Sequence, residues 1–209
     1  MTIEIFSLLM IFIAYTTFAA KRLLTYMHVL QQEDYDNGRL LKWMFTNKAY
    51  DKRLTLALLL LGGLLVALLI SGHRDLLPNF FLHLILFVLF VMTAHSEKDP
   101  RKNSKKKLVA TARAKRIFIP AVIVSLLLAI PQFFFTHPWP WIINVQLLPY
   151  LLVLVNICLK PFEDIIQVGY WREAHDKVMQ YKPVTIGITG SYGKTSIKHI
   201  LGHVLGMHA

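Results

Sequence analysis

Near the end of the 209-residue chain, one short segment combines two glycines with a lysine and two hydroxyl side chains. The segment reads Gly190-Ser191-Tyr192-Gly193-Lys194-Thr195-Ser196. Glycines at such positions let main-chain N–H groups approach an anion closely, and a lysine beside them adds a positive point charge. A hydroxyl directly after that lysine is a typical ligand of Mg²⁺. The spacing therefore predicts a loop that binds the phosphates of a nucleotide together with Mg²⁺.

The residues on either side of this loop suit such a site. Residues 184–189 are rich in β-branched side chains, which predicts a short strand. Beyond the loop, apolar residues recur at spacings of three and four, which predicts a helix. These apolar positions are Ile197, Ile200, Leu201, Val204 and Leu205. A strand, a glycine-rich turn and a helix in this order direct the helix N-terminus at a phosphate. The longer P-loop pattern would require a glycine at Ile188, so an ordinary turn that contains a lysine is the alternative.

Residues 187–196 resemble the ATP-binding signature of the Mur ligase family, and within it the D-alanyl-D-alanine-adding ligase of peptidoglycan synthesis; Lys198 is also similar to that branch. The resemblance covers about residues 183–205. It implies an ATP-dependent amide ligase that phosphorylates a carboxylate and lets an amine attack the acyl phosphate. It further implies that Lys194 contacts the β- and γ-phosphates of ATP and that Thr195 holds Mg²⁺.

The chain departs from that family in two respects. Its N-terminal part is apolar where a soluble ligase has a substrate-binding domain, and the family's metal-binding glutamate, further lysine and histidine, and C-terminal domain have no counterpart. One strand and one helix cannot form a parallel sheet, which needs neighbouring strands and covered faces. We therefore expect these residues to be a fragment of a longer enzyme, inactive by themselves.

Most of the remaining chain is apolar. Hydrophobic residues make up 55% of the sequence and the mean hydropathy is +0.48, which is too apolar for an ordinary soluble domain. Five runs of about 17–19 residues carry no Lys, Arg, Asp or Glu apart from Glu4, and each would span about 26–29 Å as a helix, enough to cross a bilayer core. The runs are residues 3–20, 54–70, 76–94, 117–135 and 142–159.

Basic residues are concentrated in two of the connections between these runs. Residues 21–53 contain seven Lys and Arg and residues 95–116 contain nine, whereas the two opposite connections contain only Arg74. Basic connections normally remain in the cytoplasm. We therefore expect a multi-pass protein of the inner or plasma membrane with its N-terminus outside and residues 160–209 in the cytoplasm, where ATP is present.

The sequence disfavours nucleic-acid binding, a functional role for the cysteine, and metal binding by histidine. The net charge of +11 would suggest nucleic acid in a soluble protein, but the bases lie beside apolar runs without interleaved aromatics, so anionic lipid headgroups are the favoured partner. Cys158 lies within an apolar run, and we expect it to be a small buried hydrophobe. His199 and His203 are four apart but lack a third ligand, so no metal site is expected at these two residues.

Two connecting segments are also expected to be helical. Residues 162–181 predict a linking helix, because the half from Tyr170 onward separates an aromatic face from a charged face, and Pro183 would end it. Residues 40–45 predict a short helix, either at the bilayer surface or, as we favour, in a cytoplasmic connector.

The sequence thus predicts an α-helical polytopic membrane domain at 1–160, a linking helix at 161–182, and at 183–209 the first strand, P-loop and helix of an α/β nucleotide-binding domain. The expected function is a membrane-anchored ATP-dependent ligase acting on a cell-envelope precursor. Two alternatives remain: a ligase that polymerises an amino acid such as glutamate, and a non-enzymatic membrane scaffold or transporter with a degenerate P-loop. The sequence does not indicate an oligomeric state.

Overall fold

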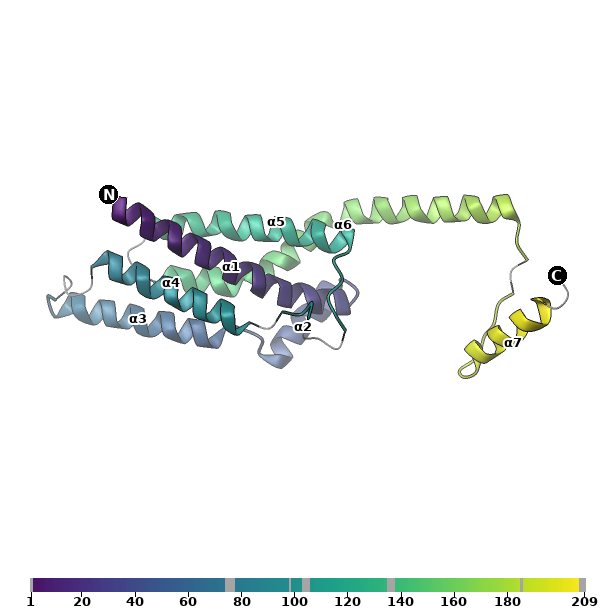
Figure 1. The fold of residues 1–209 in the computed structure, drawn as a ribbon, viewed down its shortest axis with the longest axis horizontal. Coiled ribbons are helices and arrows are strands. Elements are labelled where there is room, and N and C mark those ends of the chain that lie inside the picture. The colour runs from purple at the N-terminus through teal and green to yellow at the C-terminus, as the bar shows by residue number, and fades with distance from the viewer. Residues whose placement is uncertain are drawn as a thin grey trace. The chain divides into compact units, whose positions relative to one another are not determined.

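The computed structural model describes residues 2–73, 78–97, 99–102, 106–134, 138–184 and 186–206 (Figure 1). The regular elements of these residues are all helical, and the chain divides into two compact units, Met1–Glu163 and Asp164–Ala209. The elements are α1 (Thr2–Gln32), α2 (Asn37–Asn47), α3 (Lys52–Ile70), α4 (Asn79–Ser96), α5 (Ala112–Ala129), the 3₁₀ helix η2 (Ile130–Phe134), α6 (Trp139–Tyr181) and α7 (Lys194–Gly206).

Five of the described helices are long and apolar enough to cross a membrane. They are α1, α3, α4, α5 with the start of η2, and α6, so each predicted apolar run corresponds to one helix. The prediction of a multi-pass membrane protein with about five spans is confirmed at this level. Leu76, Leu77 and Phe135, at the ends of two predicted runs, lie outside the described residues, as does Arg74.

Helix α1 is the centre of the first unit. It contacts α4, α5 and α2, and Figure 1 shows it running between its neighbours. Its buried positions recur every three or four residues, so one face of the helix is in contact with protein along most of its length. Tyr15, Phe18, Phe90 and Trp141 form an aromatic cluster there, with ring centroids 5.1–5.7 Å apart for the contacting pairs.

The first helix is longer than predicted, because it continues through the basic residues that were expected to follow it. Lys21 Nζ donates to the main-chain oxygen of Ala94 at 2.8 Å, and Arg22 pairs with Glu97. These contacts stabilise the charges on the helix, which ends only at Gln32, before Asp34 and Tyr35 adopt left-handed backbone angles. The predicted connector at 21–53 thus contains the last turns of α1 and the whole of α2.

Helix α2 is the expected short amphipathic helix. Asp36 caps its N-terminus by accepting a hydrogen bond from Arg39 N, and Leu40 and Met44 are fully buried in the first unit. The predicted short helix is therefore confirmed, with Leu40 and Met44 packed on protein and Phe45 exposed.

Close helix packing occurs at one of the two central glycines of α3. A Cβ atom placed on Gly62 would lie only 1.7 Å from the indole nitrogen of Trp139, whereas one on Gly63 would meet nothing within 4 Å. Gly62 therefore makes room for the tryptophan ring. Helix α6 accordingly begins before the predicted run at 142–159, because Trp139 and Trp141 already belong to it, and Trp141 is buried.

Helix α6 corrects two predictions. The fifth run was expected to end at residue 159, before a separate linking helix, but a continuous helix runs through Pro161 and contains both segments. A proline removes one main-chain hydrogen bond, and helical residues on both sides keep the rest. Cys158 is exposed on this helix instead of buried, because it lies on a face that no described residue covers. The boundary between the two units falls within α6, directly after Glu163.

Candidate functional site

The glycine-rich loop has the backbone that the sequence predicted. After α6 ends at Tyr181, residues 186–193 form an irregular segment that leads into α7. Gly190 and Gly193 have φ angles of +146° and +75°, which side chains with a Cβ rarely adopt. No described neighbour would block a Cβ at Gly193, so the backbone angle itself is what requires glycine there.

Lys194 is the first residue of α7, and its side chain folds back over the loop. Its Nζ donates to the main-chain oxygen of Gly190 at 2.7 Å, so the ammonium group lies across the turn between the two glycines. The first helical hydrogen bond runs from Ile197 N to Gly193 O at 2.9 Å. The N–H groups of Lys194, Thr195 and Ser196 therefore have no partner within the helix and remain available to an anion.

The hydroxyl groups that follow the lysine are also available. Thr195 and Ser196 are exposed in the first turn of α7, and neither hydroxyl makes a hydrogen bond with any described residue. Ser191 and Tyr192 lie in the loop, and the tyrosine ring is 93% exposed. The segment from Gly190 to Ser196 thus presents main-chain donors, one cation and two oxygen ligands, a set that fits the phosphates of ATP and an associated Mg²⁺.

No strand precedes the loop within the part of the chain that the structure describes. Residues 184 and 186–190 have no strand partner, and Thr185 lies outside the described residues. The physical reason is the one noted above: a β-strand requires a neighbour to receive its main-chain hydrogen bonds. The expected strand and the α/β domain are thus not seen, whereas the expected helix is confirmed as α7.

The apolar face of α7 has no described cover. Ile197, Ile200, Val204 and Leu205 are all exposed, and no residue of the helix is buried. His199 and His203 lie on the same helix, and the described residues contain no cluster of three or more His, Cys, Asp or Glu side chains able to hold a metal ion.

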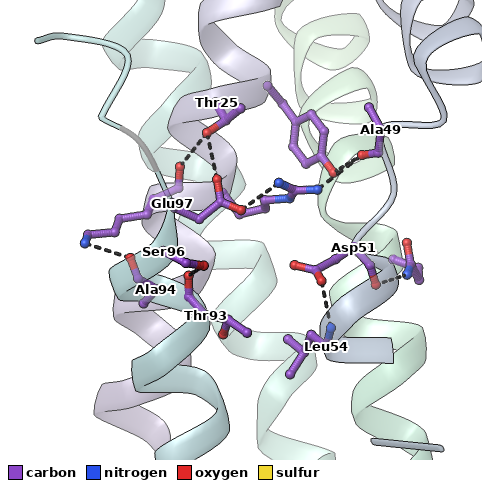
Figure 2. A network of polar contacts seen from close by, with 12 residues as sticks. Thr25, Ala49, Asp51, Leu54, Thr93, Ala94, Ser96 and Glu97 are labelled. Carbon is purple, nitrogen blue, oxygen red and sulfur yellow. Dashed lines mark hydrogen bonds and ion pairs between the residues drawn. The ribbon is translucent and has the colours of Figure 1, made fainter. Parts of the chain in front are cut away.

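Sequence reasoning missed a second polar site, in the first unit. Arg22 Nη1 lies 2.6 Å from Glu97 Oε1, and both side chains are only 15% exposed. Arg22 Nη2 and the Tyr26 hydroxyl both donate to the main-chain oxygen of Ala49, at 3.2 and 2.9 Å. Figure 2 shows these groups together with Thr25 and with the start of α3 at Asp51 and Leu54. The network joins the end of α4, the middle of α1 and the beginning of α3.

This network forms part of the wall of a cavity of about 460 Å³, which we call the interfacial cavity. Its lining is entirely polar or charged: Arg22, Thr25, Tyr50, Asp51, Lys52, Arg53, Thr93, Ser96 and Glu97. One sequence signal could have revealed this cavity. Asp51 and Glu97 are acids within the two basic segments, beside the ends of apolar runs, where they are available as partners for the bases.

The two basic segments meet at the same end of the first unit. Besides the pair of Arg22 and Glu97, His28 Nε2 lies 2.6 Å from the main-chain oxygen of Lys106, and Gln31 forms two hydrogen bonds with the main chain of Val109. Arg116 makes a two-point ion pair with Glu163, at 2.7 and 3.0 Å. Helix ends from distant parts of the sequence are thereby fixed to one another by polar contacts.

Two groups near this end have shifted pKa values. The side chain and main chain of Arg101 donate hydrogen bonds to Asp99 and lower the pKa of its carboxyl group to about 2. The Tyr50 hydroxyl is 3.1 Å from that of Tyr150, and this hydrogen bond raises the pKa of Tyr50 to about 12. Both groups therefore keep their usual charge at neutral pH.

Comparison of the chain with protein-family models, curated proteins and solved structures gave no match.

Proposed function

We propose that this chain belongs to a membrane-anchored ATP-dependent ligase that joins an amino group to a carboxylate of a cell-envelope precursor. The observation that carries the proposal is the loop at 187–196. Its sequence resembles the Mur ligase signature, Gly190 and Gly193 have positive φ angles, and Lys194 lies across the turn at the start of a 13-residue helix. Loop geometry and residue types thus support the same interpretation.

The residues of the loop would act by binding and orientation. Lys194 would exchange its bond with the Gly190 oxygen for contacts to the terminal phosphates, and the N–H groups of the first turn of α7 would hold phosphate oxygens. Thr195 would supply a hydroxyl oxygen to Mg²⁺. ATP would transfer its terminal phosphoryl group to the substrate carboxylate and leave as ADP. The amine would then attack the carbonyl carbon of the acyl phosphate, forming the amide and releasing phosphate and a proton. Positive charge fixed at the loop would oppose the negative charge that develops during phosphoryl transfer.

The membrane unit would place this reaction at the cytoplasmic face. Both basic segments lie at one end of the helices, and basic connections normally stay in the cytoplasm. In a Cys158→Ser background, a cysteine at exposed Lys107 should resist a membrane-impermeant thiol reagent in intact cells, whereas one at exposed His73 should react. The opposite labelling pattern would place the loop outside, without ATP, and would contradict the proposal.

The reaction can be tested with the longest product that the gene encodes, purified in nanodiscs. ADP release would be measured with a UDP-muramoyl peptide and D-alanyl-D-alanine, and separately with free glutamate. Turnover with the muramoyl substrate supports the proposal, and turnover with glutamate alone would instead indicate a polymerising ligase. Failure to bind ATP at millimolar concentration would favour a non-enzymatic membrane protein.

A further inference from the structure

The interfacial cavity has a charge distribution that the ligase proposal does not use. It lies where α1 leaves the predicted membrane-spanning run, where α3 enters one and where α4 leaves one. The ends of membrane-crossing helices lie near the phosphate groups of a bilayer. We therefore expect the cavity to open at the level of the lipid headgroups, on the side of the two basic segments.

The acidic groups of the cavity are already occupied. Glu97 accepts from Arg22 at 2.6 Å and from the Thr25 hydroxyl at 3.4 Å. The Asp51 carboxylate accepts from Leu54 N at 3.0 Å and thereby caps α3, as Figure 2 shows. Glu97 is thus engaged through both oxygens and Asp51 through one, and the described residues contain no cluster of three or more side chains able to hold a metal ion.

The basic groups, in contrast, are in excess. The side chains of Lys52 and Arg53 are exposed and make no hydrogen bond or ion pair with any described residue. Arg22 Nε is buried without a hydrogen-bond partner among the described residues, although both terminal nitrogens of the same guanidinium are used. The hydroxyls of Tyr50 and Ser96 border the same space but are already hydrogen-bonded, to the Tyr150 hydroxyl and to the main-chain oxygen of Thr93. The lining thus combines two cations that are unpaired among the described residues with one buried guanidinium N–H that has no partner there.

We propose that the interfacial cavity binds a phosphate monoester or diphosphate group. Multiple donors and more than one cation are the pattern that recognises phosphate oxygens. The group would be the headgroup of an anionic lipid or a free phosphate compound, since both present the same oxygens. The inference rests on the membrane unit alone and is independent of the ligase proposal, which concerns the loop at 187–196.

The test uses the 209-residue chain purified in mild detergent. Binding of dioleoyl phosphatidic acid is measured by native mass spectrometry against dioleoyl phosphatidylcholine, and binding of inorganic pyrophosphate is measured by calorimetry. The pocket variant is the double substitution Lys52→Gln and Arg53→Gln. The matched control is Arg39→Gln and Lys42→Gln, which removes the same charge from exposed positions of the same basic segment outside the cavity.

We expect the pocket variant to lose at least about tenfold in affinity and the control to change less than about twofold. Phosphatidic acid binding without pyrophosphate binding would assign a lipid headgroup, and pyrophosphate binding would assign a free phosphate compound. No preference for either phosphate probe would overturn the proposal. An equal loss in both double variants would also overturn it, because it would show general attraction to the basic segment.

A third variant separates the cavity from the surface charge. Ser96→Trp keeps every lining charge but fills the space beside Thr93 and Glu97. It should reduce phosphate binding as strongly as the charge variant if the ligand enters the cavity. Unchanged binding by a variant with wild-type helicity and elution volume would mean that the phosphate is held outside, and the proposal would fail.

Discussion

The two units of the chain differ in what surrounds their side chains. In Met1–Glu163, each of the helices α1 to α6 contributes buried residues, and two ion pairs, Arg22 with Glu97 and Arg116 with Glu163, join helix ends. In Asp164–Ala209, no described residue is buried, and the residues suited to chemistry are all exposed. The first unit has a buried core, whereas the second presents a glycine-rich loop that the described residues do not enclose.

This difference shows that the loop conformation and the enclosure of a site are separate requirements. The positive φ angles of Gly190 and Gly193 and the start of α7 at Lys194 arise from local sequence. Exclusion of water, which strengthens electrostatic interactions at a reacting group, requires further surfaces around the loop. We expect those surfaces to cover Ile197, Ile200 and Val204, whose apolar side chains are now exposed.

The sharpest test of the comparison truncates one apolar side chain in each unit. Phe90 is fully buried beside Tyr15, Phe18 and Trp141, and Phe90→Ala should destabilise the first unit by about 3–5 kcal/mol. Ile200→Ala, on the exposed face of α7, should leave the unfolding of the same chain unchanged. Unfolding of both variants in detergent micelles is followed by circular dichroism and tryptophan fluorescence. A comparable loss in both would show that α7 is packed in solution.

The second prediction concerns activity and applies to the longest gene product. Lys194→Ala should slow ligation about 10²–10³-fold, a loss of about 3–4 kcal/mol, because the cation opposite the phosphates is removed. Lys194→Arg should not restore the rate, since a planar guanidinium differs from a point charge. Ligation rates are compared at equal protein concentration in membranes.

Two further variants test whether the loss of activity is specific to Lys194. Thr195→Ala should lose activity that added Mg²⁺ partly restores, whereas Lys198→Ala, one turn further along α7, should remain close to wild type. Near-normal ligation by Lys194→Ala would show that this loop is not the catalytic nucleotide site.

The third prediction compares a partly buried ion pair with a more exposed one. The Glu163 side chain is 5% exposed and its partner Arg116, at 2.7 Å, is 41% exposed, so Arg116→Ala should destabilise the first unit by about 2 kcal/mol, less than for a fully buried pair. Arg101→Ala, which breaks the exposed pair with Asp99, should have no measurable effect. Thermal unfolding in detergent at pH 7 measures both. Replacing both partners, by Arg116→Met with Glu163→Leu, should recover most of the lost stability; continued instability would refute the explanation.

The smallest effect is expected at the two glycines of α3. Gly62→Ala introduces a methyl group into the space of the Trp139 indole and should cost about 1–3 kcal/mol. Gly63→Ala meets no neighbour and serves as the matched control, with equal or slightly higher stability. Trp139→Ala should remove the difference between the two alanine variants. If Gly62→Ala and Gly63→Ala unfold together in the presence of Trp139, the close contact does not form.

Part of this architecture could be predicted from local sequence alone. An uncharged apolar run of sufficient length predicts a membrane-crossing helix wherever it occurs, and all five runs were found as helices. The order of glycines, lysine and hydroxyls predicted the turn and the start of α7, because φ preference and helix periodicity act over a few residues. The predicted strand is not seen at residues 184 and 186–189, which the structure describes, since the stability of a strand depends on partners distant in sequence.

The face that each apolar helix buries could not be predicted in the same way. In α3, Leu58 is fully buried and Leu60 is 66% exposed, although both are leucines two residues apart in one apolar run. Lipid and protein interior are similarly apolar, so hydropathy does not distinguish the face that contacts lipid from the face that contacts protein. The expected burial of Cys158 was wrong for this reason.

The amino-acid sequence by itself determined the five apolar segments, the two basic segments between them and the chemical character of the loop from Gly190 to Ser196. Each depends on residue type and short spacing. The tertiary structure alone decided that α1 continues through Lys21 and Arg22, that Arg22 meets Glu97, and that Arg116 meets Glu163. These pairs join residues far apart in the chain, and only the packing of the helices sets which charges are close enough to interact.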